Sequence, residues 1–217
     1  MARSNKNNRL DFDLSLPSKP SESGGGWSLT KPEIHPWAWA ADVFSDTELD
    51  SIISIGKSLT LTQAKTFGNS TKEVRHSEVA FFFPNDSTSW IFQRLTGIIN
   101  AVNAQYFNFD LWSMDAGIQF TQYQHVKNND PQHYDWHVDS GIQVSNRKLS
   151  LSLQLSDPST YDGGDLQVSF GSKSETSLPK ERGIINFFPS YTMHRVTPVT
   201  RGTRYSLVCW VAGPPFR

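Results

Sequence analysis

The sequence predicts an α+β, mainly β fold: a double-stranded β-helix, or jelly roll, with N-terminal helices packed on one of its sheets. Apolar residues at helical spacing are confined to the first half of the chain, between about residues 45 and 106. From residue 110 onward, the pattern changes to short alternating segments separated by clusters of turn residues. Helices followed by many short strands are typical of a sheet sandwich with helices on one face.

The 217 residues divide into an N-terminal tail and one domain. Residues 1–31 are rich in Ser, Asn, Lys and Pro, so they cannot bury enough apolar surface to offset the entropy of ordering. We expect them to form a flexible tail or a strap on the domain surface. Residues 32–217 are long enough for a full core and comprise a helical part, 45–106, and a jelly-roll part, 110–217.

The bulk composition argues against several classes of protein. The formal net charge is -1, which gives no sign of a general nucleic-acid-binding surface. The single cysteine, Cys209, rules out an intrachain disulfide and is typical of an intracellular protein. No apolar run reaches the roughly 18–20 residues that a membrane helix needs, and the polar N-terminus lacks the apolar stretch of a secretory signal. We therefore expect a cytoplasmic protein with no membrane partner, and the sequence does not indicate its oligomeric state.

Two helices and one strand are expected in the first half of the chain. Ser45 and Glu48 form a capping box, and apolar residues at helical spacing follow it, which predicts a helix over 46–58. An apolar run at 79–83 predicts a short strand. The turn residues after it predict the cap of a second helix over 88–105.

Short strands are expected in the second half, at 116–124, 148–156, 165–170, 183–188, 193–198 and 204–212. In the strand 148–156, leucines alternate with polar residues, which places the leucines on one face and Ser150, Ser152 and Gln154 on the other. The polar face either meets solvent or lines a wet central pocket while the leucines pack under the helices. Periodicity alone leaves both arrangements open.

Two overlapping His-x-Asp triplets occur in this half: His133 with Asp135, and His137 with Asp139. Residues i and i+2 of a strand point to the same side, so either pair could hold one metal ion. A third ligand from a distant strand would complete a 2-His-1-carboxylate triad, which leaves open positions on Fe(II) for a co-substrate and oxygen. Taken alone, such a triplet is more often an ordinary surface feature than a metal site.

His194 is the candidate third ligand, because it follows an apolar strand and a turn and precedes Arg204 by ten residues. Strand parity puts Ser206 and Trp210 on the same face as Arg204. A dicarboxylate co-substrate needs a planar, permanently charged partner, which arginine supplies, and the hydroxyl of Tyr123 could be a second donor. Each residue also has an ordinary explanation as a surface ion-pair partner, a core aromatic or a hydrogen-bonded core histidine. Their combination in this order favours a site.

The ordered motifs of the second half resemble the Fe(II)- and 2-oxoglutarate-dependent dioxygenases, in their prolyl 4-hydroxylase-like branch, and look closest to the PKHD-type hydroxylases. The resemblance covers about residues 115–212. It rests on the stretches 137–139, 147–150, 155–158, 161–166, 188–190, 194–200 and 202–204.

The resemblance also distinguishes the two triplets, because the family has a short loop between its His-x-Asp pair and the next strand. The spacing to Arg147 suits His137 and Asp139 better than His133 and Asp135. The polar insert 124–132 departs from the family pattern and is expected to form a lid or a substrate-contacting loop. The expected site has His137, Asp139 and His194 as catalytic iron ligands, and Arg204, Tyr123, Gln154, Ser206 and Trp210 as co-substrate-binding residues.

The resemblance implies an oxidoreductase that uses Fe(II), 2-oxoglutarate and O2, with ascorbate as an optional reductant. Its reaction would hydroxylate a C–H bond, with a prolyl or other peptidyl residue as the first expectation, and would release succinate and CO2. A free amino acid or other small molecule is the alternative substrate, whereas the near-neutral charge disfavours nucleic acid. A jelly-roll module that binds a metal or sugar without turnover is the non-enzymatic alternative. Arg204 argues against that module, because a metal-binding module needs no carboxylate anchor.

Overall fold

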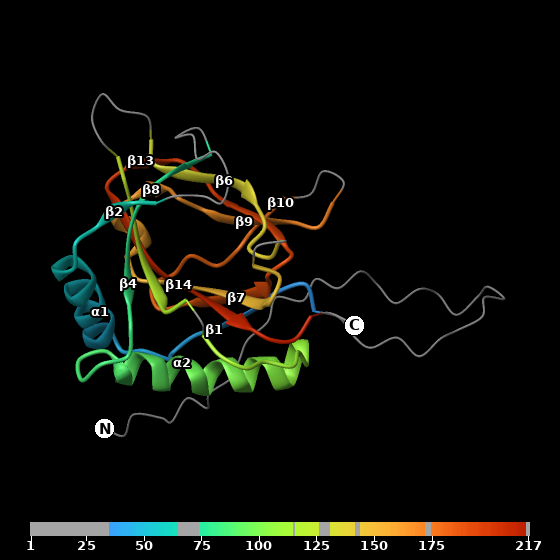
Figure 1. The fold of residues 1–217 in the computed structure, drawn as a ribbon. Coiled ribbons are helices and arrows are strands. Elements are labelled where there is room, and N and C mark those ends of the chain that lie inside the picture. Colours follow the sequence, from blue (N-terminus) through green and yellow to red (C-terminus); the bar gives the residue numbers. More distant parts are fainter. Residues whose placement is uncertain are drawn as a thin grey trace, which may run out of the picture.

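The computed structural model of the protein describes residues 35–64, 74–114, 116–125, 131–141, 144–171 and 175–215. Two sheets lie across from each other, and helices α1 (Asp46–Ser58) and α2 (Ser89–Val102) cover the outer side of the larger sheet (Figure 1). This is the predicted jelly roll with helices on one sheet. The predicted tail, 1–31, lies outside the described residues. Within the described ranges, no helix is long and apolar enough to cross a membrane.

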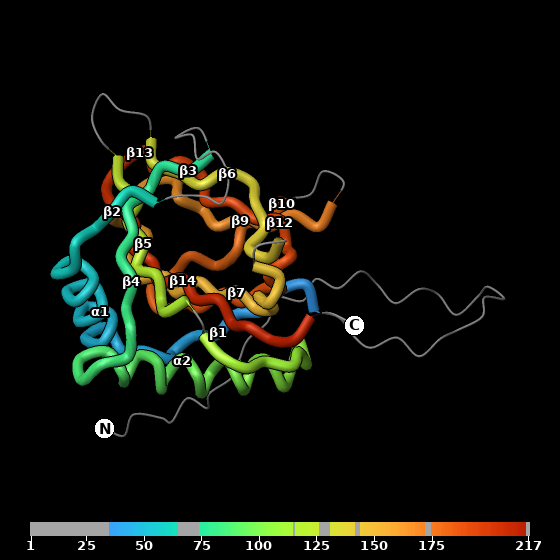
Figure 2. The backbone as a smooth tube through the Cα atoms, in the orientation of Figure 1, coloured from blue at the N-terminus to red at the C-terminus, as the bar shows by residue number. Residues whose placement is uncertain are grey.

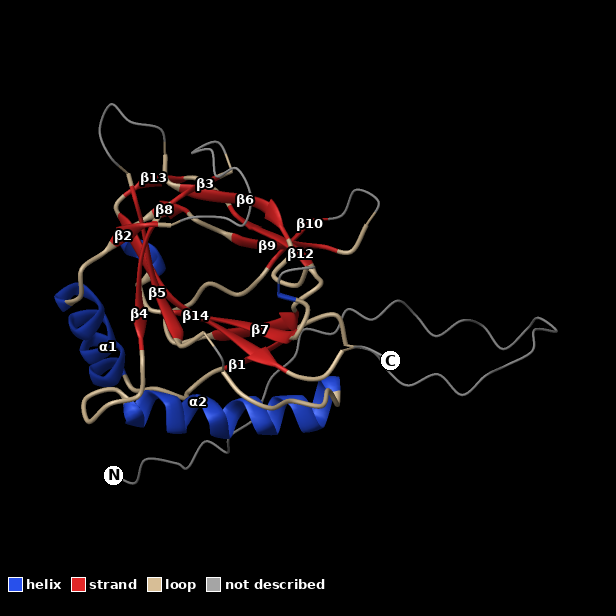
Figure 3. Ribbon diagram, viewed as in Figure 1, coloured by secondary structure: helices blue, strands red, loops and turns tan. Residues whose placement is uncertain are grey.

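Both sheets are antiparallel, and Figure 3 shows their strands in red. Within the described residues, the larger sheet has the order β1 (Ala38–Ala40), β11 (Ile185–Pro189), β7 (Arg147–Gln154), β14 (Thr203–Ala212), β5 (Ile118–Gln124), β4 (Glu78–Phe82) and β2 (Thr62–Gln63). The smaller sheet has the order β10 (Glu175–Ser177), β9 (Leu166–Ser169), β12 (Met193–Val196), β6 (His133–His137) and β3 (Arg75–His76). A separate ribbon pairs β13 (Val199–Arg201) with β8 (Asp162–Gly163), and a short 3-10 helix, η3, spans Pro158–Thr160.

The two helices match the predicted positions with one difference at each end of α2. In α1, the hydroxyl of Ser45 accepts the backbone N–H of Glu48, and the Glu48 carboxylate accepts the backbone N–H of Ser45, so the capping box is confirmed. The N-cap of α2 is Thr88 without a side-chain cap hydrogen bond, so the predicted cap in the preceding turn is wrong. At its other end, α2 passes into a π-helical turn, η1 (Asn103–Phe107), which contains the predicted helix end at 105.

The leucine face of β7 forms the main core. Gly56 allows α1 to approach β5 closely, because a side chain at this position would overlap the ring of Phe120. The apolar residues buried between the helices and the larger sheet include Leu49, Ile52, Ile91, Leu95, Ile99, Leu149, Leu151, Leu153 and Leu155.

The opposite face of β7 is polar and equally buried. Ser150, Ser152 and Gln154 lie between the two sheets, and the strand pairs with β14 so that Gln154 is opposite Ser206. Across this space, β6 and β12 run side by side although they are far apart in the sequence (Figure 2). The polar face therefore lines a central pocket, which is one of the two arrangements that periodicity had left open.

Candidate active site

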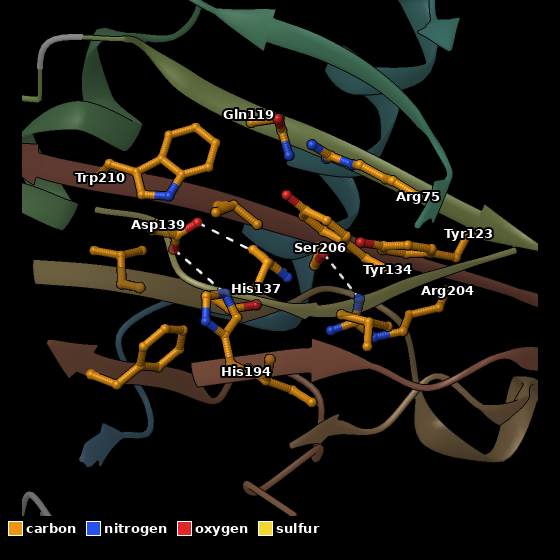
Figure 4. Close-up of a pocket in the computed structure, with 16 residues that line it drawn as sticks. Arg75, Gln119, Tyr123, Tyr134, His137, Asp139, His194, Arg204, Ser206 and Trp210 are labelled. Atoms are coloured by element: carbon orange, nitrogen blue, oxygen red, sulfur yellow. Dashed lines mark hydrogen bonds and ion pairs between the residues drawn. The ribbon is translucent and has the colours of Figure 1, made fainter. Parts of the chain in front are cut away.

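Three potential metal ligands converge on the inner side of the smaller sheet (Figure 4). His137 ends β6 and is paired directly with His194 of β12, while Asp139 follows β6. The Nε2 atoms of His194 and His137 lie 3.5 Å and 3.8 Å from the two carboxylate oxygens of Asp139. All three ligand atoms lie within 4.8 Å of one another, and in the described part of the chain they are the only group of this kind.

Both histidines direct their Nε2 atoms at this centre. The Nδ1 of His137 is 2.7 Å from the carbonyl oxygen of Asp135, and the Nδ1 of His194 is 2.9 Å from that of Thr192. A carbonyl oxygen only accepts, so each Nδ1 carries the proton and donates it. In the neutral tautomer that donates from Nδ1, the Nε2 lone pair faces the centre together with the carboxylate of Asp139.

The protonation states agree with this arrangement. Burial, assisted by the neighbouring His194, lowers the pKa of His137 to about 3, so its imidazole is neutral at pH 7. Burial alone would raise the pKa of Asp139, but the two histidines and a hydrogen bond from Ser150 hold it below its ordinary value. Three acceptors that face one point favour a cation between them. Two imidazoles and one carboxylate form a donor set that suits Fe(II).

The carboxylate of Asp139 is held by the larger sheet. The Ser150 hydroxyl on β7 donates to its Oδ2 at 2.7 Å, and the same hydroxyl is 2.9 Å from that of Ser190. The backbone N–H of Asp139 also donates to the carbonyl of Ser190 at 2.9 Å. Ser150 and Ser190 thus orient Asp139, which follows a strand of the smaller sheet. In the sequence, Ser150 is marked only by its place on the polar face of β7.

A buried arginine lies at the other end of the same cavity (Figure 4). The side chain of Arg204 on β14 is 1% exposed, and its terminal nitrogens donate to Gln154 at 2.8 Å and to Ser206 at 3.2 Å. Its Nε atom has no hydrogen-bond partner, and among the described residues no carboxylate pairs with it. A buried cation without a counter-charge is costly, so the cavity suits an anionic ligand at this end.

The remaining predicted residues gather around the same cavity, which we call the inner cavity. Tyr123 is directly opposite Arg204 in the β5–β14 pairing, and the Arg204 guanidinium lies 5.5 Å from the centre of its ring. Gln154 contacts Arg204 but is not among the lining residues, whereas Ser206 both contacts Arg204 and lines the cavity. Trp210 lies at the other end, where its buried indole N–H is beside Asp139 and has no hydrogen-bond partner.

Tyr134 also lines the inner cavity, although it was not predicted. Its ring stacks on that of His137 with 3.4 Å between centroids. Two residues of β12, His194 and Val196, pair with residues of β6 that are three apart, so β6 contains a bulge between Tyr134 and His137. The bulge puts both side chains on the same face, which strict alternation does not allow.

The competing triplet lies outside the metal cluster. Asp135 is exposed, and the Nδ1 of His133 is hydrogen-bonded to the carbonyl oxygen of Pro131. The predicted lid, 124–132, is described only at its two ends, where Gln132 accepts the backbone N–H of Gln124 at 2.9 Å. Residues 126–130 lie outside the described residues, so the function of this loop stays a prediction.

Sequence comparisons relate the chain to known oxygenases. Residues 118–212 match the family model of the 2OG-Fe(II) oxygenase superfamily. A PKHD-type hydroxylase of Teredinibacter turnerae is 42% identical over 86 residues, which cover 36% of this chain and 37% of the relative. The PKHD-type hydroxylase YbiX of Escherichia coli O9:H4 is 33% identical over 135 residues, which cover 58% of this chain and 57% of the relative. The chain thus spans less than two thirds of the length of either relative.

Solved structures show the same fold. A prolyl hydroxylase from Trichoplax adhaerens, in complex with a peptide fragment of hypoxia inducible factor, has a TM-score of 0.68 at 14% identity, and the match covers 82% of this chain and 84% of that chain. A prolyl-4-hydroxylase of Pseudomonas putida has a TM-score of 0.65 at 20% identity, with coverage of 83% and 94%.

The fold and the cluster together define a jelly-roll protein with the ligand set of a non-haem iron oxygenase. The family match makes this more specific. Residues 118–212 match the 2OG-Fe(II) oxygenase superfamily, and the chain is similar in sequence to PKHD-type hydroxylases. The cofactors that this family implies are Fe(II), 2-oxoglutarate and O2.

Proposed function

We propose that the protein is an Fe(II)- and 2-oxoglutarate-dependent dioxygenase that hydroxylates a C–H bond of a peptidyl residue, with proline first, and releases succinate and CO2. One observation carries the proposal: the buried, uncompensated guanidinium of Arg204 shares a cavity with the His-Asp-His cluster. A module that only held a metal or a sugar would gain nothing from a buried cation at this position, since the cation costs stability.

The proposed roles follow from the contacts. His137, Asp139 and His194 would hold Fe(II), and Arg204 would receive the distal carboxylate of 2-oxoglutarate through its planar fork. Bound iron and 2-oxoglutarate supply the oxidising chemistry. The hydroxyl of Tyr123 would donate a second hydrogen bond to that carboxylate.

Other residues position these groups. Gln154 and Ser206 accept hydrogen bonds from two nitrogens of Arg204 and so fix the plane of its guanidinium. Ser150 does the same for the carboxylate of Asp139. Next to the cluster, Phe188 packs on His194 with 4.6 Å between ring centroids and so supports the ring of this ligand. Trp210 would present its free indole N–H toward a ligand of the metal.

The peptidyl substrate is supported by the relatives and fold neighbours, which are named as PKHD-type or prolyl hydroxylases. The alternative is a free amino acid or another small molecule. Ascorbate would act only as an accessory reductant. Mass spectrometry of candidate peptides and metabolites after incubation, with a search for a gain of one oxygen, distinguishes the two substrate classes.

Two measurements test the reaction class. Titration of the anaerobic Fe(II) protein with 2-oxoglutarate should produce a metal-to-ligand charge-transfer band, and aerobic incubation should produce succinate. Asp139→Ala should abolish both. Asp135→Ala is the matched control, because it removes the exposed carboxylate of the other His-x-Asp triplet, and it should behave as the wild type. Equal succinate formation by the wild type and Asp139→Ala would refute the proposal, and absence of the band in the wild type would favour the binding module.

A further inference from the structure

A second, wider cavity adjoins the inner cavity, and we call it the outer hollow. Its volume is about 440 Å³, against about 40 Å³ for the inner cavity. The inner cavity is therefore too small for a substrate of peptide size, which needs the outer hollow. Five residues line both cavities, namely Arg75, Gln119, Tyr134, Asp139 and Trp210, so a molecule in the outer hollow lies next to Asp139 of the metal cluster.

Two arginines border the outer hollow from opposite sheets. Arg75, on β3, is buried, donates from its Nε to Ser77 at 3.1 Å and lies 4.4 Å from the centre of the Tyr134 ring. Arg147, at the start of β7, lies 4.0 Å from the centre of the Trp210 ring. Stacking occupies the flat face of a guanidinium and leaves its N–H edge available for a planar anion.

Neither arginine has a carboxylate partner of its own among the described residues. The terminal nitrogens of Arg75 have no hydrogen bond there, and Arg147 makes only a long contact of 3.4 Å to the backbone carbonyl of Asp139. Surface arginines of this protein behave differently. Arg195 and Arg201, for example, are each paired with a carboxylate. In the described part of the chain, Arg75 and Arg147 therefore differ from these surface arginines, because neither has a carboxylate partner.

The charges of the proposed iron site do not satisfy these arginines either. The two positive charges of Fe(II) and the one of Arg204 are balanced by Asp139 and by the two carboxylates of 2-oxoglutarate. Arg75 and Arg147 then remain as two uncompensated, partly desolvated cations beside the place where the substrate must enter. Such an arrangement attracts and binds an anion from outside.

Three exposed apolar side chains also line the outer hollow. Phe81 and Phe83, at the end of β4, are 39% and 59% exposed, and Val138, between two metal ligands, is 42% exposed. Exposed aromatic rings next to free cations indicate a binding surface for a molecule with both an apolar and an anionic part.

We propose that the outer hollow is the substrate subsite, in which Arg75 and Arg147 bind a carboxylate of the substrate while its apolar part packs on Phe81 and Phe83. This inference rests on the proposed function. The carboxylate can come from an acidic side chain near the hydroxylated residue, from the C-terminus of a peptide or from a free amino acid. All three share the planar anion that two guanidinium edges recognise.

The test uses the iron-loaded full chain with 2-oxoglutarate and three substrate pools. These are randomised pentapeptides capped at both ends, the same peptides with a free C-terminal carboxylate, and free amino acids. Products that gain one oxygen are identified by mass spectrometry. With capped peptides, we expect Asp and Glu to be enriched over Asn and Gln by about tenfold or more, as for a charge-assisted hydrogen bond. Enrichment only in an uncapped pool would support the same subsite and identify the source of the carboxylate.

Charge variants separate recognition from a structural role. Arg75→Gln and Arg147→Gln should each reduce the acid-to-amide ratio toward one, and Arg147→Glu should favour peptides with Lys or Arg instead. The ratio is taken within one variant, so a lower overall rate does not affect it. Arg94→Gln is the matched control, because Arg94 also lies over an aromatic ring, that of Phe44, but is on α2, outside the outer hollow. It should keep the wild-type ratio.

Three results would overturn the inference. The first is oxygenated products that show no acid preference in any pool, and the second is an Arg147→Glu variant that keeps the acid preference. Either result would refute the substrate subsite but leave the proposed function intact. If Arg75→Gln does not fold, the acid-to-amide ratios of Arg147→Gln and Arg147→Glu still test the subsite. No succinate and no oxygenated product in any pool would refute the proposed function, and the substrate subsite with it.

Discussion

Replacement of Arg204 by methionine should abolish tight binding of 2-oxoglutarate without destabilising the metal-free protein. The substitution removes a buried guanidinium that can donate two charge-assisted hydrogen bonds to the distal carboxylate. Each such bond contributes about 1.5–3 kcal/mol. Loss of both therefore weakens binding by about 3–6 kcal/mol, or roughly 10²- to 10⁴-fold in Kd.

The expected effect on stability has two opposing parts. In the wild type, folding buries the Arg204 guanidinium, which has no carboxylate partner among the described residues. This burial costs several kcal/mol, and methionine avoids the cost because it is uncharged. The variant leaves the acceptor oxygens of Gln154 and Ser206 without their donor, which costs about 1–3 kcal/mol for each buried group. The two parts nearly cancel, so we expect the free energy of unfolding to stay within about 2 kcal/mol of the wild type.

Urea unfolding of the metal-free protein measures the free energy, and anaerobic titration of the charge-transfer band measures Kd. Arg201→Met is the matched control: Arg201 is exposed and paired with Asp162, so its removal should change neither quantity. A loss of more than about 3 kcal/mol in the Arg204→Met protein would refute the reasoning, because the guanidinium would then be a structural anchor. Wild-type affinity for 2-oxoglutarate in that variant would refute it as well.

Three further predictions concern the same site. Ser150→Ala removes the hydrogen bond to the carboxylate ligand and should weaken metal binding about 10- to 100-fold, measured by competition with a chelator. In the metal-free protein, the pKa of His137 is about 3, below the value near 6.5 of an unfolded histidine, so the unfolded state binds more protons between these values. The contribution of His137 to the free energy of unfolding should therefore be complete above about pH 6.5. It should fall by up to about 1.4 kcal/mol per pH unit on acidification toward pH 3. Urea unfolding at several pH values measures this slope, and His137→Phe should reduce it. Gly164 has a φ of 63°, and a Cβ there would lie 2.8 Å from Cδ of Arg204. Gly164→Ala should reduce the free energy of unfolding by about 1–3 kcal/mol and weaken 2-oxoglutarate binding. Gly171 is the control, because its φ is 96° but a Cβ there would meet no other atom, so Gly171→Ala should show the backbone strain alone. Thermal unfolding with and without 2-oxoglutarate measures both effects.

Strand parity predicted which of the candidate residues share a face. Alternation in β14 puts Arg204, Ser206 and Trp210 on one face, and the structure has all three on the inner face of the larger sheet. The same rule separates the leucines of β7 from Ser150 and Gln154. Periodicity succeeds here because both strands are long and regular over the part that crosses the core. It could not say which polar face lines a pocket, because burial of a polar face depends on the second sheet.

The residues that sequence reasoning missed lie where regular alternation ends. Tyr134 reaches the inner cavity because of the bulge in β6. Arg75 belongs to a strand of only two residues, Arg75–His76, which is too short for any periodic signal. Arg147 is the first residue of its strand, where parity does not determine the direction of a long side chain. These three positions depend on how the two sheets meet, and that contact has no local pattern in the sequence.

The separation between the two ends of the inner cavity is set by one strand, β7. Its inner face carries Ser150, which holds Asp139, and four residues further on Gln154, which holds Arg204. At about 3.3 Å per residue, the two positions are about 13 Å apart along the strand, a span that suits a metal ion and a short dicarboxylate in line. A slip of one residue against β14 would turn both polar side chains toward the helices and bring leucines into the cavity. A slip of one residue would thus disrupt both the leucine core and the spacing of the site. The stability of the core therefore also maintains the distance between the proposed metal ligands and the proposed co-substrate anchor.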